Sequence, residues 1–397
     1  MAAMETLVLM GASLIDGTGA EPAPGRAVVV EGGRIASVVD ESRAPRGRRI
    51  DLSGCTLLPG LINCHVHLCL GAEVDPVRVL KEEPAALTAL KALLRAKETV
   101  EAGVTTVRDL GGREYVELSV RRAVAEGLFP GPRILAAGRP ICMTGGHGNF
   151  VGREADGPDD VRKAVREQLK AGADVIKIIA TGGVLTPGVE PGSPQLTLAE
   201  MLAAVEEARK AGRLAAAHAQ GSAGIADAVE AGITTIEHGI FLTDEIIASM
   251  KRKGVFLVPT LAAPAAICAA GLAAGIPEFV VRKSNAVMPH HIASFQRAAK
   301  AGVRIAAGAD SGTPVNFHGS LLPELELMVK YGMTPLEAIR SATSVAAEAL
   351  GLGGETGRVA DGYAADLLAV AGQPGERIGA LGDVRLVLAR GAIIKLP

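Results

Sequence analysis

The segment PGLINCHVHL, residues 59–68, joins an apolar strand-like run to two histidines that are separated by a single residue. Side chains alternate across a β-strand with a period of two, so His65 and His67 point to the same side. Two imidazoles on one side of a strand end can bind one metal ion. The segment therefore predicts a strand that ends in a metal site.

Further apolar runs follow this segment, and amphipathic helical stretches separate most of them. The runs are GVTTVRDLGG (103–112), RILAAG (133–138), DVIKIIATGG (174–183), LAAAHAQG (214–221), TTIEHG (234–239), FLVPTL (256–261) and RIAAGADSG (304–312). VRKAVREQLKAGA (161–173) and LAEMLAAVEEARKAG (198–212) have helical apolar spacing and a glycine near the end. Eight βα units in roughly 300 residues favour an α/β fold closed into a (β/α)8 barrel over an open doubly wound sheet. No G-x-G-x-x-G opens the first unit, which argues against a dinucleotide site.

Both ends of the chain are rich in strand patterns. TLVLMGASLID and AVVVEGGRIASVV, with a Gly32-Gly33 hairpin signal, lie near the start, and AADLLAV, VRLVLARG and AIIKLP lie near the end. We expect residues 1–57 and 355–397 to form one composite β-sandwich domain. The catalytic barrel then spans residues 58–354.

Composition narrows the class of protein. With 48% hydrophobic residues, the chain is expected to build a large core. The net charge is -2 without a cluster of lysine or arginine, which argues against nucleic acid or an anionic membrane as partner and favours a small molecule. We find no signal peptide pattern and no apolar run of membrane-spanning length, so we expect a cytoplasmic protein. The 5 scattered cysteines lack a C-x-x-C pair and are expected to be reduced.

Polar residues also mark the ends of later runs. Lys177 interrupts the apolar strand VIKII, while His218, His238 and Asp310 end three other runs. A single histidine at a strand end is more often structural than a ligand. Four histidines at strand ends, joined by a carboxylate and an unexplained lysine, predict a metal centre at the C-terminal mouth of the barrel.

Lys177 is expected to be neutral rather than charged. An ammonium group among Val and Ile side chains loses its hydration, and this cost favours the unprotonated amine. A neutral amine can add carbon dioxide to become a carbamate, which is a carboxylate that can bridge two cations. The alternative is a salt bridge from Lys177 to Asp310 or Asp174.

The motifs PGLINCHVHL, VIKI, AHAQG, IEHG and GADS resemble the strand-end motifs of the binuclear-metal amidohydrolases. The similarity covers essentially the whole chain, including MTPLEAIRSATSVAAEALGL (333–352) and GRVADGYAADLLAV (357–370). MTGGHGNFVG (143–152) and TGGVLTPGVEPGSPQLT (181–197) bring the chain nearest to the imidazolonepropionase-like branch. That branch contains Xaa-Pro dipeptidases and N-acyl amino acid hydrolases.

This resemblance implies a set of ligands and a mechanism. The implied metal ligands are His65, His67 and Asp310 for the more buried ion, His218 and His238 for the more exposed ion, and a carbamylated Lys177 that bridges both. A hydroxide that bridges two divalent ions, zinc by first choice, attacks the scissile carbonyl. Asp310 then acts as general base and afterwards as general acid. Manganese, iron or cobalt suits the same ligands.

Substrate contacts are less clearly marked than the metal ligands. His147 lies in a glycine-rich loop and is expected to contact the substrate carbonyl, and His318 is expected to line the pocket. His290 and His291 lie in a segment with a helical sequence pattern and are expected on the solvated surface. The candidate cations for a substrate carboxylate are Arg108, Arg139 and Arg153.

The resemblance implies hydrolysis of an amide bond in dipeptides or N-acyl amino acids, with proline or a hydrophobic residue as the leaving group. Hydrolysis of cyclic amides, or of xenobiotic amides, carbamates or ureas, is the alternative, and phosphotriesters and lactones are minor ones. A deaminase carries a glutamate three residues after the strand-five histidine, where this chain has Gly221. A non-catalytic scaffold is expected to have lost ligands, and all the expected positions are filled. Related enzymes commonly form homo-oligomers, so a homo-oligomer is expected.

Overall fold

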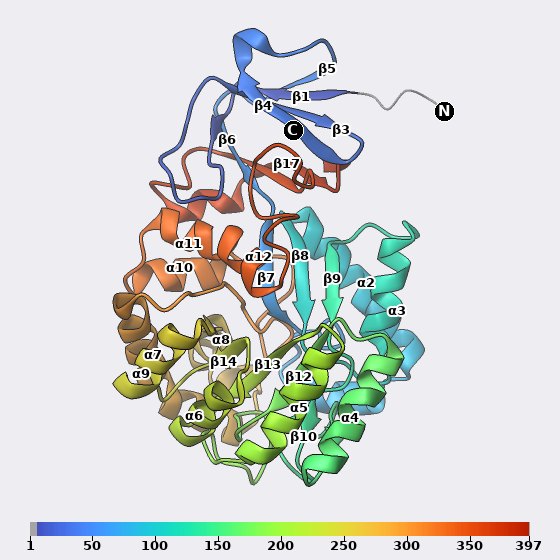
Figure 1. Ribbon diagram of the computed structural model, residues 1–397, viewed down its shortest axis with the longest axis vertical. Coiled ribbons are helices and arrows are strands. Elements are labelled where there is room, and N and C mark those ends of the chain that lie inside the picture. Colours follow the sequence, from blue (N-terminus) through green and yellow to red (C-terminus); the bar gives the residue numbers. More distant parts are fainter. Residues whose placement is uncertain (1–5, 397) are drawn as a thin grey trace.

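The computed structural model describes residues 6–396, and its larger part is built on parallel strands (Figure 1). One sheet has the order β7-β8-β9, and a second has the order β11-β10-β12-β13-β14-β15. The strands are β7 (Leu61–Val66), β8 (Val104–Asp109), β9 (Arg133–Ala136), β10 (Ile141–Cys142), β11 (Arg153–Glu154), β12 (Val175–Ile179), β13 (Leu214–Ala219), β14 (Thr235–His238) and β15 (Phe256–Val258). The predicted α/β fold is therefore confirmed.

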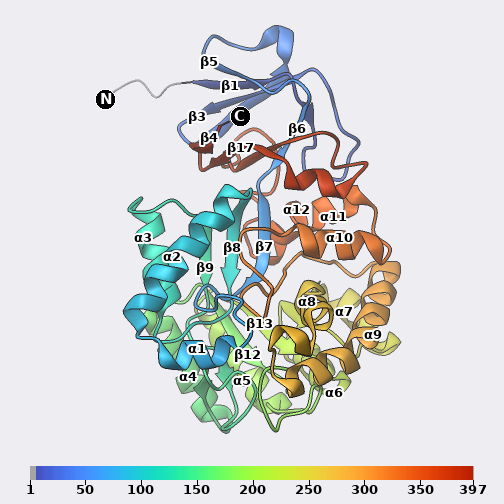
Figure 2. The same ribbon diagram turned by 180° about the vertical axis from the view of Figure 1, so that it is seen from behind.

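Helices cover both flanks of these strands, with α1 to α4 on one side and α6 to α10 on the other (Figure 2). Their bounds are α1 (Pro76–Glu82), α2 (Ala85–Glu101), α3 (Val116–Ala125), α4 (Pro158–Ala171), α5 (Leu198–Lys210), α6 (Ser222–Ala231), α7 (Asp244–Lys253), α8 (Ala262–Ala270), α9 (Glu278–Ala301), α10 (Leu322–Lys330), α11 (Pro335–Ser341) and α12 (Ser344–Ala349). Helix α5 begins with a capping box in which Thr197 and Glu200 satisfy each other's backbone N–H groups. Helix α4 ends at Gly172, whose φ of 101° suits a residue without Cβ.

The eighth predicted strand is not a regular strand. Residues 304–312, all of which the structure describes, form only isolated bridges, Leu257 with Ile305 and Val66 with Ser311. Gly308 explains part of the irregularity, because a Cβ there would lie 3.0 Å from the backbone nitrogen of His65. The run still lies between β15 and β7 and links the two parallel sheets. Closure into an eightfold barrel stays a prediction.

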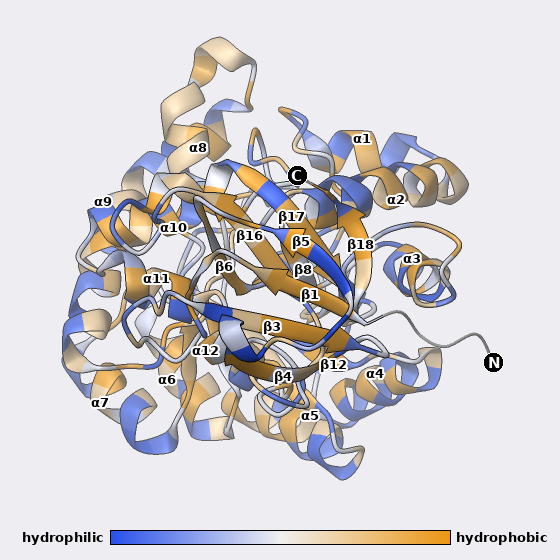
Figure 3. Ribbon diagram, turned by 90° about the horizontal axis from the view of Figure 1, so that it is seen from above, coloured by the Kyte–Doolittle hydropathy of each residue, from blue (hydrophilic) through white to orange (hydrophobic). Residues whose placement is uncertain are grey.

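Strands from both ends of the chain lie together above this body (Figure 3). One sheet has the order β4-β3-β1-β5, and another has the order β18-β17-β16-β6-β2. Their bounds are β1 (Leu7–Met10), β2 (Ser13–Leu14), β3 (Arg26–Glu31), β4 (Arg34–Asp40), β5 (Arg48–Asp51), β6 (Cys55–Pro59), β16 (Leu367–Ala371), β17 (Val384–Ala389) and β18 (Ala392–Lys395). The hairpin predicted at Gly32-Gly33 joins β3 to β4. Strand β16 pairs with β6, so the two ends of the chain share a sheet.

Strand β16 connects the cores of the two regions. Leu367 packs in the core between the terminal sheets, and its neighbour Leu368 packs in the main core. Successive side chains of a strand point to opposite faces, so both faces of this sheet are apolar. Leu368 also lies over Gly103, where a Cβ would approach to 2.7 Å. The sheet is therefore held between two hydrophobic cores.

None of the helices within residues 6–396 combines the length and the apolarity needed to cross a membrane.

Truncation of either core leucine of β16 is expected to destabilise the protein. Leu367→Ala and Leu368→Ala should each lower the free energy of unfolding by about 2–5 kcal/mol, because each removes a fully buried side chain and leaves a cavity. Urea unfolding followed by circular dichroism measures the change. Leu94→Ala, at a leucine that is 61% exposed, is the matched control and should change stability by less than about 0.5 kcal/mol. Equal effects at all three positions would contradict this account of the two cores.

Candidate active site

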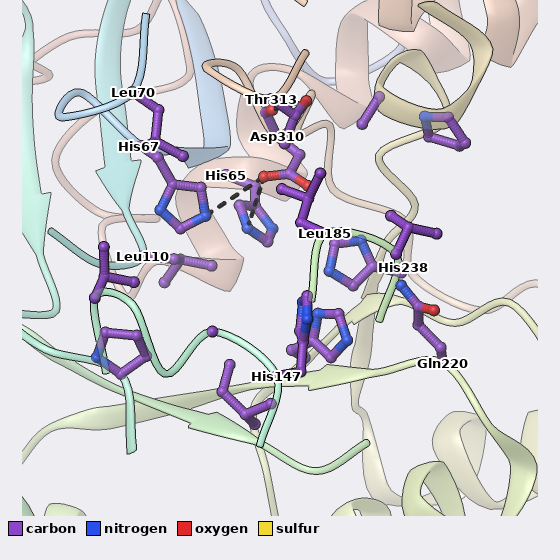
Figure 4. Close-up of a pocket in the computed structure, with 18 of the residues that line it drawn as sticks. His65, His67, Leu70, Leu110, His147, Leu185, Gln220, His238, Asp310 and Thr313 are labelled. Atoms are coloured by element: carbon purple, nitrogen blue, oxygen red, sulfur yellow. Dashed lines mark hydrogen bonds and ion pairs between the residues drawn. The ribbon is translucent and has the colours of Figure 1, made fainter. Parts of the chain in front are cut away.

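The predicted metal ligands converge on one cavity of about 80 Å³ (Figure 4). The residues concerned, all of which line it, are His65, His67, Lys177, His218, His238 and Asp310. They come from the carboxyl ends of β7, β13 and β14, from the middle of β12, and from the run that follows α9. The same end of a parallel sheet therefore gathers residues that are far apart in the sequence.

The donor atoms lie close enough together to share metal ions. The Nε2 atoms of His65 and His67 are each 3.4 Å from Oδ1 of Asp310. The ring centroids of His218 and His238 are 4.5 Å apart, and those of His65 and His238 are 5.2 Å apart. One ligand atom from each of His65, His238 and Asp310 falls within 4.8 Å of the other two.

Each of the four histidines has one ring nitrogen held by a partner outside the cavity. The pairs are His65 Nδ1 with Glu237 Oε2 at 2.9 Å, His67 Nδ1 with the Gly111 carbonyl at 2.8 Å, His218 Nε2 with the Gly182 carbonyl at 3.1 Å, and His238 Nδ1 with Thr260 Oγ1 at 2.7 Å. Such bonds fix the tautomer and the ring orientation of metal-binding histidines. The other nitrogen of each ring is left for a metal ion.

Burial keeps these imidazoles uncharged. Loss of hydration holds the pKa of His65, His218 and His238 well below the ordinary value of 6.5, and it lowers the pKa of His67 as well. Metal ions bind the unprotonated form of histidine. The nitrogens are therefore ready for a metal at neutral pH.

Lys177 and Asp310 complete the donor set. Burial lowers the pKa of Lys177 to about 8 and raises the pKa of Asp310 to about 7. Among the described residues, Lys177 Nζ and Asp310 Oδ1 have no hydrogen-bond partner, and Asp174 pairs with Arg121. The salt-bridge alternative for Lys177 is therefore wrong. Unpartnered buried polar atoms facing neutral imidazoles fit divalent metal ions, and a partly neutral amine fits carbamate formation.

Unusual backbone geometry aims two of the ligands. His238 has a φ of 72°, Asp310 a φ of 55° and Thr260 a φ of 54°, in the left-handed region that side chains with a Cβ rarely adopt. At His238 this geometry breaks the alternation of β14, so Glu237 and His238 both serve the site. Strained residues that cluster in this way are typical of functional sites.

A buried ion pair below the cavity escaped the sequence analysis. Glu237 is 0% exposed and its Oε1 accepts a hydrogen bond of 2.7 Å from Arg108, which is 1% exposed. Arg108 also donates to the Cys64 carbonyl at 2.7 Å. The other oxygen of Glu237 holds His65. The signal was present, because Glu237 interrupts the apolar run TTIEHG as Lys177 interrupts VIKII.

The three arginines considered for a substrate carboxylate do not line the cavity. Arg108 is bound to Glu237, Arg139 donates to the Val151 carbonyl, and Arg153 faces two carboxylates of helix α4. Each arginine therefore has a structural partner.

His147 lines the cavity and is positioned by Thr186. Its Nδ1 lies 3.0 Å from Thr186 Oγ1, and the same oxygen accepts the Gly148 N–H at 3.3 Å. Burial lowers the pKa of His147 to about 3, so the ring is neutral and carries a single proton. That proton lies on Nε2 in the tautomer in which Nδ1 accepts the Thr186 hydroxyl proton.

Two other histidine predictions need correction. His318 hydrogen-bonds the Leu70 carbonyl at 2.9 Å and does not line the cavity, because the chain turns away from the cavity after Thr313. His291 is 1% exposed and lines the cavity, which contradicts its predicted surface position. It lies one helical turn after Val287, on the buried face of α9. His290 is exposed as predicted.

The remaining walls of the cavity are mostly apolar. They include Leu110, Phe150, Ile179, Leu185, Ile240 and Ile267. Gln220 adds a buried side-chain amide whose Oε1 has no partner among the described residues. The cavity therefore places metal-binding groups against a hydrophobic surface, as in many small-molecule sites.

Comparisons with known proteins agree with this geometry. Ochratoxinase from Aspergillus niger is 32% identical over 405 residues, covering 94% of this chain and 82% of the relative. The crystal structure of a Xaa-Pro dipeptidase with bound methionine in its active site superposes with a TM-score of 0.90 at 33% identity, covering 98% of this chain and 99% of that one. The ochratoxinase crystal structure has a TM-score of 0.87 at 30% identity, covering 99% and 96%.

A shorter stretch resembles a third protein, imidazolonepropionase from Klebsiella pneumoniae, at 53% identity over 45 residues, which is 11% of each chain. The model of the amidohydrolase family matches residues 56–395, which include every ligand of the cavity. The motif resemblance is thereby confirmed, and the chain belongs to the amidohydrolase family.

Proposed function

We propose that this hydrolase cleaves the amide bond of N-acyl amino acids or dipeptides, with proline or a hydrophobic residue as the leaving group. The observation that carries the proposal is the donor set of four neutral histidines, Lys177 and Asp310 at the base of an apolar cavity. Hydrolysis of an unactivated amide needs a strong nucleophile and a proton for the departing amine. Both requirements can be met at this donor set.

Two divalent ions, zinc by preference, would be held by His65, His67, His218, His238 and Asp310, with Lys177 contributing as a carbamate. Bound ions of this kind lower the pKa of water to about 7 and so make hydroxide available at neutral pH. The hydrogen bonds to one nitrogen of each ring hold the four imidazoles in place in the absence of metal. The proposed architecture around them is a closed (β/α)8 barrel of residues 58–354 with a composite β-sandwich.

Asp310 is the residue that moves the proton in this proposal. Its Oδ1 lies 3.4 Å from Nε2 of both His65 and His67, and a carboxylate at this position can act first as general base and then as general acid. The carboxylate accepts the proton of the nucleophile and delivers it to the amine nitrogen as the C–N bond breaks. Asp310 itself has a positive φ of 55°, and this backbone geometry directs its carboxyl group toward the cavity.

His147 orients the scissile carbonyl. In the proposed tautomer Nδ1 accepts the Thr186 hydroxyl proton, and Nε2–H is then free to donate. A hydrogen bond to the carbonyl oxygen strengthens as negative charge develops on that oxygen. Gly183 leaves room for the ring, since a Cβ there would lie 2.5 Å from Nε2.

Hydrophobic substrates are favoured by the walls of the cavity and by one relative. Leu110, Phe150 and Ile179 present apolar surface beside the metal-binding groups. The related Xaa-Pro dipeptidase holds methionine, a hydrophobic amino acid, in its active site. A hydrophobic leaving residue therefore suits both observations.

A second candidate is hydrolysis of neutral amides, carbamates or ureas. It is favoured by charge, because Lys177 is the sole lysine or arginine among the described residues that line the cavity. A substrate carboxylate inside the cavity would have no lysine or arginine to pair with once Lys177 is a carbamate. An uncharged leaving group avoids this desolvation cost.

Lys177→Ala is expected to lose bound metal, because it removes the proposed bridging ligand. Elemental analysis after dialysis should show less than half of the metal of the unaltered protein. Added propionate should restore part of the metal and of the turnover. Lys300→Ala provides a control at an exposed lysine of α9 that does not line the cavity. Unchanged metal content in Lys177→Ala would exclude the bridging role.

Asp310→Asn is expected to damage turnover far more than folding. The amide cannot accept the proton, so kcat should fall by about 10²–10⁴-fold. The midpoint of thermal unfolding should move by only a few degrees. Metal content is measured on the same preparation to separate ligand loss from proton transfer. Near-normal kcat would show that Asp310 is not the proton shuttle.

The two candidate substrate classes are separated by one matched pair. N-benzoyl-L-phenylalanine and its C-terminal amide differ only in the charge of the leaving group, and released benzoate reports cleavage of the same bond in both. The first candidate predicts a higher kcat/KM for the free acid, and the second predicts a higher value for the amide. N-benzoyl-L-proline tests the proline preference. No benzoate from any of them, with metal bound, would contradict amide hydrolysis of this class.

A further inference from the structure

A second hollow, which we call the outer groove, lies next to the cavity and has a volume of about 390 Å³. Its apolar walls are Val74, Leu185, Pro187, Pro277, Phe279 and Pro314. We propose that this groove is the subsite for the hydrophobic side chain of the leaving amine. The inference rests on the proposed amide hydrolysis and adds where the leaving group is recognised.

The size of the inner cavity requires such an extension. Its volume is about 80 Å³, and a cavity of about 150 Å³ is known to hold one benzene molecule. The scissile amide and the bound ions already need this inner space. A leaving group with an aromatic or branched side chain must therefore extend beyond it.

The apolar wall is continuous from the cavity to the groove. Leu185 lines both. Ile267 of the cavity and Val280 of the groove belong to one buried cluster, against which Val74 and Phe279 pack. A hydrophobic chain that leaves the cavity past Leu185 thus stays in contact with apolar side chains.

The position of Asp310 shows which half of the substrate points to the groove. Asp310 and Thr313 line the cavity (Figure 4), and the next residue, Pro314, lines the groove. The carboxyl group delivers its proton to the departing amine, so the amine lies on the side of this loop. The acyl half consequently points away from this loop.

The shared wall is held in place by a buried lysine. Lys283 of α9 is 2% exposed, and its ammonium donates to the Thr186 carbonyl at 2.9 Å and to the Val189 carbonyl. These bonds anchor the loop that carries Leu185. The groove is therefore preformed, which lowers the entropic cost of binding.

Selectivity for the leaving group tests the proposal. N-benzoyl-L-alanine and N-benzoyl-4-phenyl-L-phenylalanine share the scissile benzoyl–nitrogen bond. They differ in the side chain that enters the groove. The unaltered enzyme should have the higher kcat/KM for the larger substrate. Phe279→Ala should reduce the ratio of the two values by about ten-fold, as expected for loss of one aromatic contact surface. Phe129→Ala removes a phenylalanine that is 47% exposed between α3 and β9, and it should leave the ratio unchanged.

Equilibrium binding tests the groove without turnover. Calorimetric titration with 4-phenyl-L-phenylalanine and with its amide should give a Kd that is about ten-fold weaker for Phe279→Ala than for Phe129→Ala. If the binding difference is found but neither amide is hydrolysed, the groove stands and the proposed function falls. If hydrolysis occurs while Phe279→Ala changes neither selectivity nor binding, or if the unaltered protein binds neither probe, the groove proposal is overturned.

Discussion

The buried carboxylate of Glu237 is the constraint on which the active site depends. One oxygen pairs with Arg108 and the other holds Nδ1 of His65, so neither is left for Lys177. Removing one member of such a buried pair typically costs about 3–5 kcal/mol, because the remaining charge is uncompensated. The pair therefore fixes the His65 ring and also leaves Lys177 without a carboxylate partner. That lack of a partner, together with burial, favours the neutral amine that the proposed carbamate of Lys177 requires.

The sequence located the six candidate metal ligands because parallel strands bring their carboxyl ends to one edge of the sheet. The six residues were recognised from their places at or in apolar runs, and all of them line the same cavity. Glu237 was missed because it was read only as the neighbour of His238. His291 was misplaced because helical periodicity tells which residues share a face, but not which neighbouring element covers that face. The apolar runs in the middle of the chain predicted the parallel strands, and those at its two ends predicted the terminal sheets.

Local backbone geometry is the part that the sequence pattern does not encode. The run RIAAGADSG has the composition of a strand, yet the structure gives it two isolated bridges and a left-handed Asp310. Gly308 permits the backbone of His65 to approach, and this approach takes the place of a regular ladder. A strict strand would alternate its side chains and could not turn Asp310 and the following loop as observed. The irregularity thus positions the carboxylate between two histidines.

Protons and metal ions compete for the same nitrogens in this site. Burial depresses the pKa of His147 to about 3 and those of the neighbouring imidazoles below 6.5, while the unfolded chain keeps the ordinary value near 6.5. Between these pH values the unfolded state binds more protons than the folded state. The contribution of these rings to the free energy of unfolding is therefore fully present above pH 6.5 and is lost as the pH falls. Metal ions at the proposed site would need the same unprotonated rings and would stabilise the folded chain by mass action. A fall in pH therefore weakens the fold directly and would also release the metal, and both effects originate in the burial that creates the site.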